Sequence, residues 1–223
     1  METHFETGLD NLKQQLLTMA SHVESAVNQA LQALTQRDYD LALRVKESDS
    51  VIDQFEITID ELVIQLLTKA PLASNLRFVT VAMKISQNLE RIGDEATKIA
   101  KRARDLSQEP PVKLNLDLPR MAALALEMLK AALDAFVNHD SAAARAVIPR
   151  DKEVDALNKK IHAALAQHMV ANPDTIGRCL HWMVVSKSLE RIADHATNIA
   201  EEVVYLCEAE DIRHVHALIQ PPK

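Results

Sequence analysis

The 223 residues are enough for two domains of about 110 residues each, and a hydrophobic share of 48% is ample for their cores. Only 3 Gly and 8 Pro are present, which excludes folds rich in hairpins or glycine loops, while the abundant Ala, Leu, Gln, Glu and Lys favour helices. With a net charge of −7, the chain lacks the dense positive surface that nucleic-acid binding requires. We therefore expect an all-α protein with no nucleic-acid partner.

The N-terminus and the two cysteines indicate the compartment. The first residues contain no cationic segment followed by an apolar stretch, so no signal peptide is expected, and no window approaches the roughly 18 apolar residues of a membrane span. Cys179 and Cys207 are too far apart for a zinc-thiolate or redox motif, which is typical of a reducing compartment. These features predict a cytoplasmic protein.

Apolar residues in the first half of the chain recur at alternating steps of three and four, the pattern of helices packed on a core. The pattern predicts three helices, over residues 16–33, 45–66 and 82–106. Pro71 follows the second helix, and the pair Pro110-Pro111 prevents the third from continuing. Short connections make consecutive helices antiparallel, so this half is predicted to form a three-helix bundle.

The second half repeats this pattern. Residues 118–135 correspond to the first helix, and the segment 189–200 repeats the segment 89–100 almost unchanged. Asp140 takes the place of Asp38, and aspartate is a favourable residue at a helix start. The chain is therefore predicted to be an internal duplication that gives two tandem three-helix bundles with six antiparallel helices. The predicted boundaries are 1–106 for the first repeat, 107–116 for a linker, and 117–223 for the second repeat with a short C-terminal tail.

Charged residues recur together with the apolar ones. Glu90 and Asp94 of the first repeat reappear as Glu190 and Asp194 in the second, and residues four apart lie on one side of a helix. Their heptad positions predict that all four side chains point away from the apolar seam. Because like charges at this spacing destabilise a helix, their presence in both repeats predicts a nearby cation.

The second helix of each repeat carries a matching pair of aspartates. If this helix lies beside the third, each bundle gains a cluster of carboxylates, and oxygen ligands suit hard cations such as magnesium, manganese, calcium or iron. The eight candidate metal ligands are Asp49, Asp53, Glu90, Asp94, Asp151, Asp155, Glu190 and Asp194.

The two candidate sites are expected to differ. Glu56 and Asp60 continue the acidic stripe in the first repeat, whereas Asn158 and His162 stand at these places in the second. Another interpretation stays open for both sites, because acidic residues on outward helix faces are commonly solvated and paired with surface cations. Arg91 and its counterpart in the second repeat are the nearest such cations.

An enzymatic interpretation finds less support. A di-iron oxidase of the helical-bundle type needs Glu-x-x-His on inward faces, and no predicted helix core has that spacing. No serine lies at a strand-to-helix turn as a hydrolase nucleophile would. A metal-dependent phosphatase or nucleotidase that uses the carboxylate clusters remains the alternative, although no catalytic residue can be assigned.

The motif Leu-Glu-Arg-Ile-[Gly/Ala]-Asp at 89–94 and 189–194, the aspartate pairs of the second helices and the closing segment 212–215 together resemble the PhoU family of bacterial phosphate-signalling proteins. The resemblance covers about residues 5–216. It implies two three-helix bundles, usually as a homodimer in the cytoplasm. It also implies multinuclear clusters of iron or zinc in some members, with manganese or magnesium as further candidates for these oxygen ligands.

The function that the resemblance implies is regulatory. Members of the family repress the phosphate-starvation regulon and restrain high-affinity phosphate uptake when phosphate is plentiful. They act as adaptors between the ATPase subunit of the phosphate ABC transporter and a sensor histidine kinase of the phosphate two-component system. We therefore expect a non-enzymatic negative regulator of phosphate homeostasis, which reaches the membrane only through its partners.

Overall fold

The computed structural model describes residues 2–68, 73–112 and 114–213, and in these ranges the chain forms helices and connections but no strand. The helices of the first repeat are α1 (Glu2–Gln36), α2 (Tyr39–Leu67) and α3 (Ala73–Ser107). Those of the second repeat are α4 (Leu118–Asn138), α5 (Ser141–Val147), α6 (Asp151–Ala171) and α7 (Ile176–Glu208), with short 3-10 helices at Ile148–Arg150 and Pro173–Thr175. The prediction of an all-α protein with two tandem bundles is confirmed.

Two further predictions concern membranes and the end of the chain. No helix in the described ranges combines the length and the apolar character that a membrane crossing requires. His214 and Val215, which belong to the closing segment singled out in the sequence, lie outside the described residues.

Both repeats begin their second helix in the same way. Asp38 precedes α2, and its Oδ1 accepts a hydrogen bond of 2.9 Å from the backbone N–H of Leu41. Asp140 precedes α5 and accepts an equivalent hydrogen bond of 2.9 Å from Ala143. Each bond satisfies a backbone donor that has no partner inside the first helical turn. The two aspartates therefore act as the N-caps that the sequence predicted.

The duplication extends into the cores of the two repeats. Met19 and Met121 are fully buried, as expected for packing residues. Ser86 donates a hydrogen bond to the sulfur of Met19 at 3.5 Å, and Ser186 donates one to the sulfur of Met121 at 3.6 Å. The same buried contact is therefore present in both bundles.

The second repeat departs from the first in its middle helix. One continuous helix was expected there, by analogy with α2, but the chain forms α5, a 3-10 turn and α6. Pro149 lies in this turn. A proline has no backbone N–H and its ring clashes with the carbonyl group four residues earlier, so it interrupts an α-helix. The first repeat has Glu47 at the equivalent position, and α2 is unbroken.

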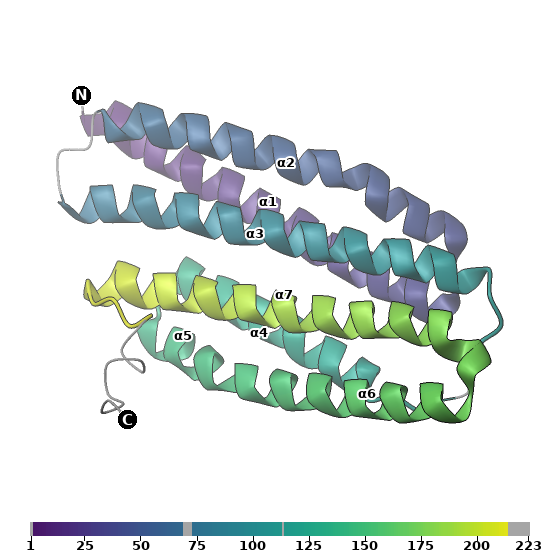
Figure 1. Ribbon diagram of the computed structural model, residues 1–223. Coiled ribbons are helices and arrows are strands. Elements are labelled where there is room, and N and C mark those ends of the chain that lie inside the picture. Colours follow the sequence, from purple (N-terminus) through teal and green to yellow (C-terminus); the bar gives the residue numbers. More distant parts are fainter. Residues whose placement is uncertain (1, 69–72, 113, 214–223) are drawn as a thin grey trace, which may run out of the picture.

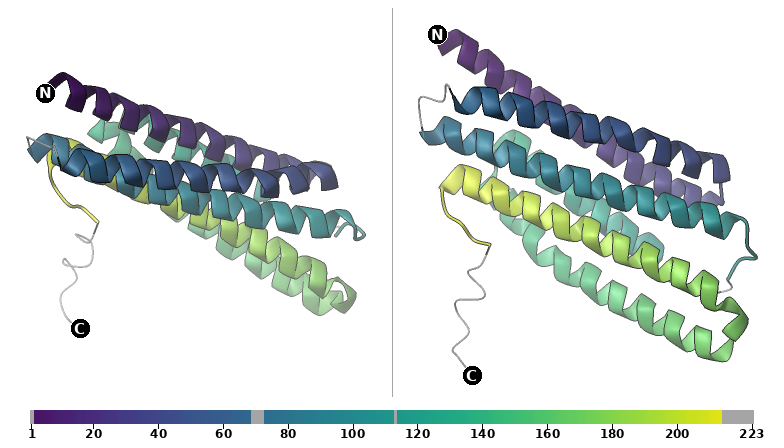
Figure 2. Two further views of the ribbon diagram at one scale, coloured as in Figure 1. Left: turned by 90° about the horizontal axis from the view of Figure 1, so that it is seen from above. Right: turned by 45° about the horizontal axis from the view of Figure 1, so that its top comes forward.

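The helices form two layers. In Figure 1, α2, α3, α7 and α6 lie side by side in the nearer layer, and α1 and α4 lie behind them. The views in Figure 2 agree with this order and place α2 and α6 at the two edges of the nearer layer. The apolar side chains of each repeat meet between the layers, where Leu16, Leu89 and Met128 are among the fully buried residues.

The antiparallel helices α3 and α7 join the two repeats (Figure 1). Lys84 Nζ lies 3.1 Å from Glu202 Oε2, and Arg191 Nη1 lies 3.2 Å from Glu95 Oε1, so residue numbers rise along α3 as they fall along α7. Because α3 and α7 are equivalent helices of the two repeats, this pairing relates the repeats by an approximate two-fold axis.

Candidate functional site

Two groups of carboxylates lie in the nearer layer, one in each repeat. The first acidic face lies between α2 and α3 and consists of Asp49, Asp53, Glu56, Asp60, Glu90 and Asp94. The second acidic face lies between α6 and α7 and consists of Asp151, Asp155, Glu190 and Asp194. In each repeat the structure therefore brings together the carboxylate pairs of two helices, as the sequence predicted. Phe55, on roughly the opposite side of α2, contacts the ring of His22 of α1 in a tilted arrangement, so the first acidic face is turned away from α1.

Like charges are crowded in the first acidic face. Burial, followed by the negative charge of Asp94, raises the pKa of Glu90, and the positive charge of Arg91 only partly opposes this shift. Burial and the charge of Asp60 raise the pKa of Glu56 in the same way. A carboxyl group has a raised pKa when its charged form is poorly compensated. The first acidic face thus carries more negative charge than its surroundings neutralise.

The expectation that all four motif carboxylates point outward is wrong for the two glutamates. The Glu90 side chain is 15% exposed and the Glu190 side chain 11%, whereas that of Asp94 is 39% exposed. Heptad labels describe one seam only, but α3 contacts α1, α2 and α7, and α7 contacts α3, α4 and α6. A position outside one seam therefore lies against the next helix. The glutamates line the junction of two helices, and the aspartates lie nearer to solvent.

The second acidic face shows the same crowding around Asp194. Burial, followed by the charges of Glu190 and Asp151, raises the pKa of Asp194 to about 6, although Lys187 opposes the shift. Lys187 also forms an ion pair with Glu190 on the same helix. Burial and the charges of Asp155 and Glu190 raise the pKa of Asp151. At neutral pH, Asp194 therefore lies close to the pH range in which its carboxylate takes up a proton.

The donor atoms of both faces fit a hard cation chemically. Their carboxylate oxygens are the ligands that magnesium, manganese and iron accept, and Asp151 Oδ1 and Asp60 Oδ1 are buried without a hydrogen-bond partner. Among the described residues, however, no group of three or more His, Cys, Asp or Glu side chains is arranged to hold one metal ion. Side-chain rotations would be needed before either face could coordinate an ion, and the ligand assignment of all eight residues stays a prediction.

The two arginines of the repeated motif have different partners. Arg91 pairs within the first acidic face, with Nε 3.3 Å from Glu90 and Nη1 3.5 Å from Asp94. Its counterpart Arg191 pairs instead with Glu95 of the other repeat. The interpretation of the acidic pairs as arginine-paired surface groups therefore applies to the first face in part, and in the second face Lys187 takes this role.

Glu95 is a buried residue that the sequence did not single out. It is 4% exposed, and its carboxylate contacts Lys98 at 2.8 Å and Arg191 at 3.2 Å. Burial alone would raise the pKa of Glu95, but hydrogen bonds from Lys98, Ser188 and Arg191 outweigh it and lower the pKa. Its counterpart in the second repeat is His195, which is bonded to Asn88 at 2.9 Å. The difference between Glu95 and His195 inside an otherwise repeated segment is the sequence feature that could have indicated a contact between the repeats.

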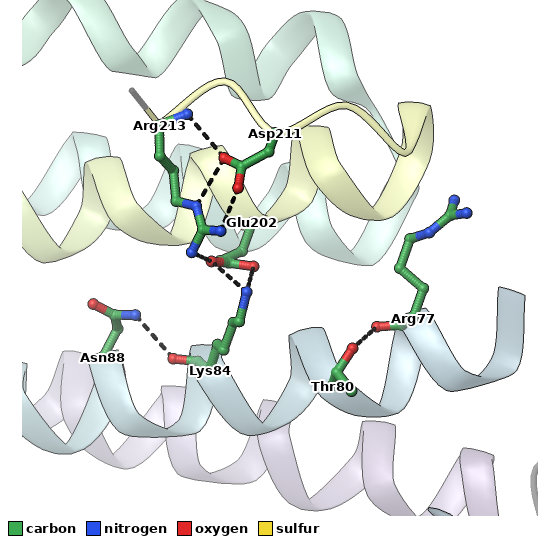
Figure 3. A network of polar contacts seen from close by, with 7 residues as sticks. All are labelled: Arg77, Thr80, Lys84, Asn88, Glu202, Asp211 and Arg213. Atoms are coloured by element: carbon green, nitrogen blue, oxygen red, sulfur yellow. Dashed lines mark hydrogen bonds and ion pairs between the residues drawn. The ribbon is translucent and has the colours of Figure 1, made fainter. Parts of the chain in front are cut away.

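A second such contact involves the chain end (Figure 3). Glu202 is buried on α7, and Lys84 of α3 donates hydrogen bonds of 3.2 and 3.1 Å to its two carboxylate oxygens. Arg213, beyond the end of α7, donates a bond of 3.1 Å to the same carboxylate and also pairs with Asp211. The two repeats and the segment after α7 are thus joined at one carboxylate. The residues equivalent to Lys84 and Glu202 in the other repeat are Val184 and Arg102, which cannot form this ion pair. A comparison of the two repeats therefore could not predict the contact.

The raised pKa of Asp194 gives a testable prediction for stability. The folded pKa of about 6 lies above the unfolded value of about 3.9, so between these two values the folded state binds a proton that the unfolded state has released, and stability is lost as the pH rises from about 4 through 6. Asp194→Asn should therefore stabilise the chelator-treated protein at pH 7.5 by about 1–2 kcal/mol, after allowance for solvent screening. Thermal unfolding at pH 7.5 and at about pH 4, near the unfolded pKa, measures this, with an expected gain of about 2–8 °C at the higher pH.

The control for this prediction is Glu47→Gln, at an exposed position of α2. This variant should leave the dependence of the melting temperature on pH unchanged. The Asp194→Asn gain should shrink near pH 4, because the carboxyl of Asp194 is then largely protonated in the folded state and about half protonated in the unfolded state. An equal gain at both pH values would show that the charge of Asp194 is not its cause.

Comparison with known proteins assigns the chain to a family. The PhoU domain matches residues 16–103 and 118–203, once in each repeat. The phosphate-specific transport system accessory protein PhoU homolog of Pseudomonas aeruginosa is 39% identical over 95% of this chain and 88% of its own length, and the PhoU protein of Escherichia coli is 34% identical over the same shares.

Solved structures agree with the sequence relatives. The crystal structure of PhoU from Pseudomonas aeruginosa superposes with a TM-score of 0.90 and 38% identity, over 92% of this chain and 100% of that one. That of the phosphate transport system regulatory protein PhoU from Streptococcus pneumoniae gives 0.84 and 30%, over 93% and 99%. On the evidence of the duplicated motif, the two acidic faces and these relatives, the chain belongs to the PhoU family.

Proposed function

We propose that this protein is a non-enzymatic accessory of a phosphate transport system that represses the phosphate regulon and restrains high-affinity uptake when phosphate is plentiful. The observation that carries the proposal is the pair of crowded, incompletely neutralised acidic faces on a duplicated helical scaffold. Such faces offer charge to a partner protein or to a metal ion that bridges to one. Relatives named as accessory or regulatory proteins of phosphate transport support the role.

The proposed partners are the ATPase subunit of a phosphate ABC transporter and a sensor histidine kinase, on the cytoplasmic side of the membrane. A scaffold with two faces can hold two partners at once, and binding the first raises the effective concentration of the second. We further propose that the protein forms a homodimer. Affinity purification from phosphate-replete cells, with identification of the bound membrane proteins, tests these partners. Recovery of neither the transporter nor the kinase under crosslinking would contradict the adaptor role.

The alternative is a metal-dependent phosphatase or nucleotidase that uses the carboxylate clusters. An assay with a panel of phosphoesters and nucleotides, each in the presence of iron, zinc, manganese or magnesium, separates the two functions. The adaptor proposal expects no turnover above that of the metal salt alone. Turnover that is lost on substitution of the acidic faces would establish the enzyme instead.

Metal binding is a separate proposal. We expect the protein purified without chelator to contain iron, zinc, manganese or magnesium, because a bound cation would compensate the burial and the repulsion that together raise the pKa of Glu90 and of Asp194. The double variant Asp94→Ala with Asp194→Ala should lose most of this metal in elemental analysis. Asp174→Ala, an exposed substitution outside both faces, is the control. Unchanged metal content in the double variant would show that the ligand assignment is wrong.

A further inference from the structure

Two exposed apolar side chains lie beside the carboxylates of the first acidic face, outside the apolar core of the repeat. Ile57 is 52% exposed and Ile64 is 65% exposed. The two are seven residues apart, which is two helical turns, so they lie on the same side of α2. Single exposed apolar residues are ordinary on protein surfaces. Two large β-branched residues in register on one side of a helix form a more ordered pattern than such single residues do.

These isoleucines alternate with carboxylates of the face. Asp53, Ile57, Asp60 and Ile64 follow one another at steps of four, three and four, which is the spacing of a single stripe on a helix. The stripe therefore offers two apolar side chains with acidic groups before and between them, and Glu90 and Asp94 of α3 lie beside it. At about 1.5 Å per residue it is about 17 Å long, which matches three turns of a partner helix.

The second repeat keeps the carboxylate pairs but not this stripe. The residues equivalent to Ile57 and Ile64 are Lys159 and Ala166, and His162 replaces Asp60. Lys187, which pairs with Glu190, stands where the first repeat has an uncharged glutamine. Each face thus has a cation paired with its carboxylates, Arg91 in the first and Lys187 in the second, but the second face lacks the pair of isoleucines. Val170 of α6 is 85% exposed, but within α6 no carboxylate lies three or four residues from it. The alternation of exposed isoleucines with carboxylates is therefore found in the first repeat.

We infer that the first acidic face binds a basic amphipathic helical segment of a partner protein, with the apolar ridge of that helix on Ile57 and Ile64 and its flanking Lys or Arg side chains on Asp53, Asp60 and Asp94. The inference rests on the proposed function, in which the protein acts by contacting partners, and it names the chemistry of one contact. An amphipathic helix presents apolar anchors at the same three- and four-residue spacing. Positive flanks match a face whose carboxylates outnumber its cations. An anionic lipid surface is disfavoured because it would be repelled by the same charge.

The probe for this inference is a synthetic 14-residue helical peptide with leucines on one side and lysines on both flanks. Its affinity for the full chain is measured by fluorescence anisotropy in EDTA, so that metal does not occupy the carboxylates. A second peptide has the same composition in an order that places leucines all round the helix. We expect at least tenfold tighter binding of the amphipathic peptide. Equal binding of the two peptides, or no binding of either, would overturn the inference.

A matched pair of variants tests the position of the contact. Ile64→Lys and Val51→Lys make the same change of charge on the same helix, and both side chains are exposed, 65% and 40% respectively. Val51 points about 140° away from Ile64 around the helix axis. Ile64→Lys should weaken peptide binding at least tenfold, and Val51→Lys should change it less than twofold. Equal loss in both variants would assign the binding to overall charge and contradict the proposed stripe.

The remaining outcome concerns a second copy of this chain. Sedimentation velocity of the wild type and of Ile64→Lys shows whether this stripe joins two protomers. We expect the same oligomeric state for both proteins, and dissociation of Ile64→Lys alone would show that the occupant is another copy and not a foreign helix. Failure of these binding experiments would leave the regulatory role untouched, because that role is tested by partner recovery and by transcription in cells.

Discussion

Cells whose only copy of this protein carries Asp53→Lys with Asp94→Lys should transcribe phosphate-starvation genes in phosphate-rich medium at the level of a deletion strain. The two substitutions change the charge of the first acidic face by four units, at one exposed and one 39% exposed side chain. Neither aspartate belongs to the apolar core, so the fold should survive. A promoter fusion in rich and poor phosphate measures the effect, and circular dichroism with thermal melting checks the fold.

The control for this experiment makes the same change of charge at two exposed positions outside both acidic faces, Glu47→Lys with Asp174→Lys. If the first acidic face recognises a basic partner, this second variant should retain more repression. Glu90 is left unchanged because its side chain is largely buried. A lysine there could unfold the protein, and a loss of repression would then not report on partner binding. Full repression by a folded Asp53→Lys, Asp94→Lys protein would show that the first acidic face is not a signalling surface.

A leucine at Gly93 should destabilise the protein by about 1–3 kcal/mol, the usual cost of overpacking a core. A Cβ atom at Gly93 would lie 3.0 Å from Ile52 Cδ1 and 3.3 Å from Ile52 Cγ2, so a large side chain would force α2 and α3 apart. Chemical denaturation gives the free energy of unfolding, and the melting temperature should fall by about 2–4 °C per kcal/mol. Gly177→Leu is the control, because a Cβ atom there meets nothing within 4 Å.

The second repeat indicates which change would compensate. There Ala193 replaces Gly93, and the buried residue equivalent to Ile52 is the smaller Val154. The double variant Gly93→Ala with Ile52→Val should therefore be at least as stable as the sum of its single variants predicts, with the favourable coupling that contacting residues show. Strict additivity of the two changes would mean that Gly93 and Ile52 do not limit each other.

The fold follows from the sequence because its signals are local and repeated. Apolar spacing, the N-cap aspartates at Asp38 and Asp140, and the near-identity of 89–100 and 189–200 all act within one helix or one repeat. The break at Pro149 was also readable in principle, since proline cannot continue a helix. It was missed because the match to the unbroken α2 outweighed a single residue.

The candidate site was predicted only in part. The sequence identified the eight carboxylates that the structure gathers in two groups, because pairs at four-residue spacing must share a side of a helix. It did not indicate the burial of Glu90, Glu95, Glu190 and Glu202, because that burial arises from contacts between helices far apart in the chain. Glu95 contacts a residue 96 positions away, and Glu202 one that is 118 positions away. Heptad positions carry no information on such neighbours.

The antiparallel pairing of α3 with α7 has a consequence for the origin of the molecule. Two identical three-helix units that met through their third helices in this way would form a symmetric dimer, in which each contact occurs twice. After a fusion of their genes, the two copies can diverge. Glu95 of the first repeat pairs with Arg191 of the second, whereas at the symmetry-equivalent contact His195 takes the place of Glu95 and lies near Arg91. In a true homodimer, every substitution at the contact would appear on both sides. The single chain therefore has the geometry of an ancestral dimer and can specialise one half without altering the other.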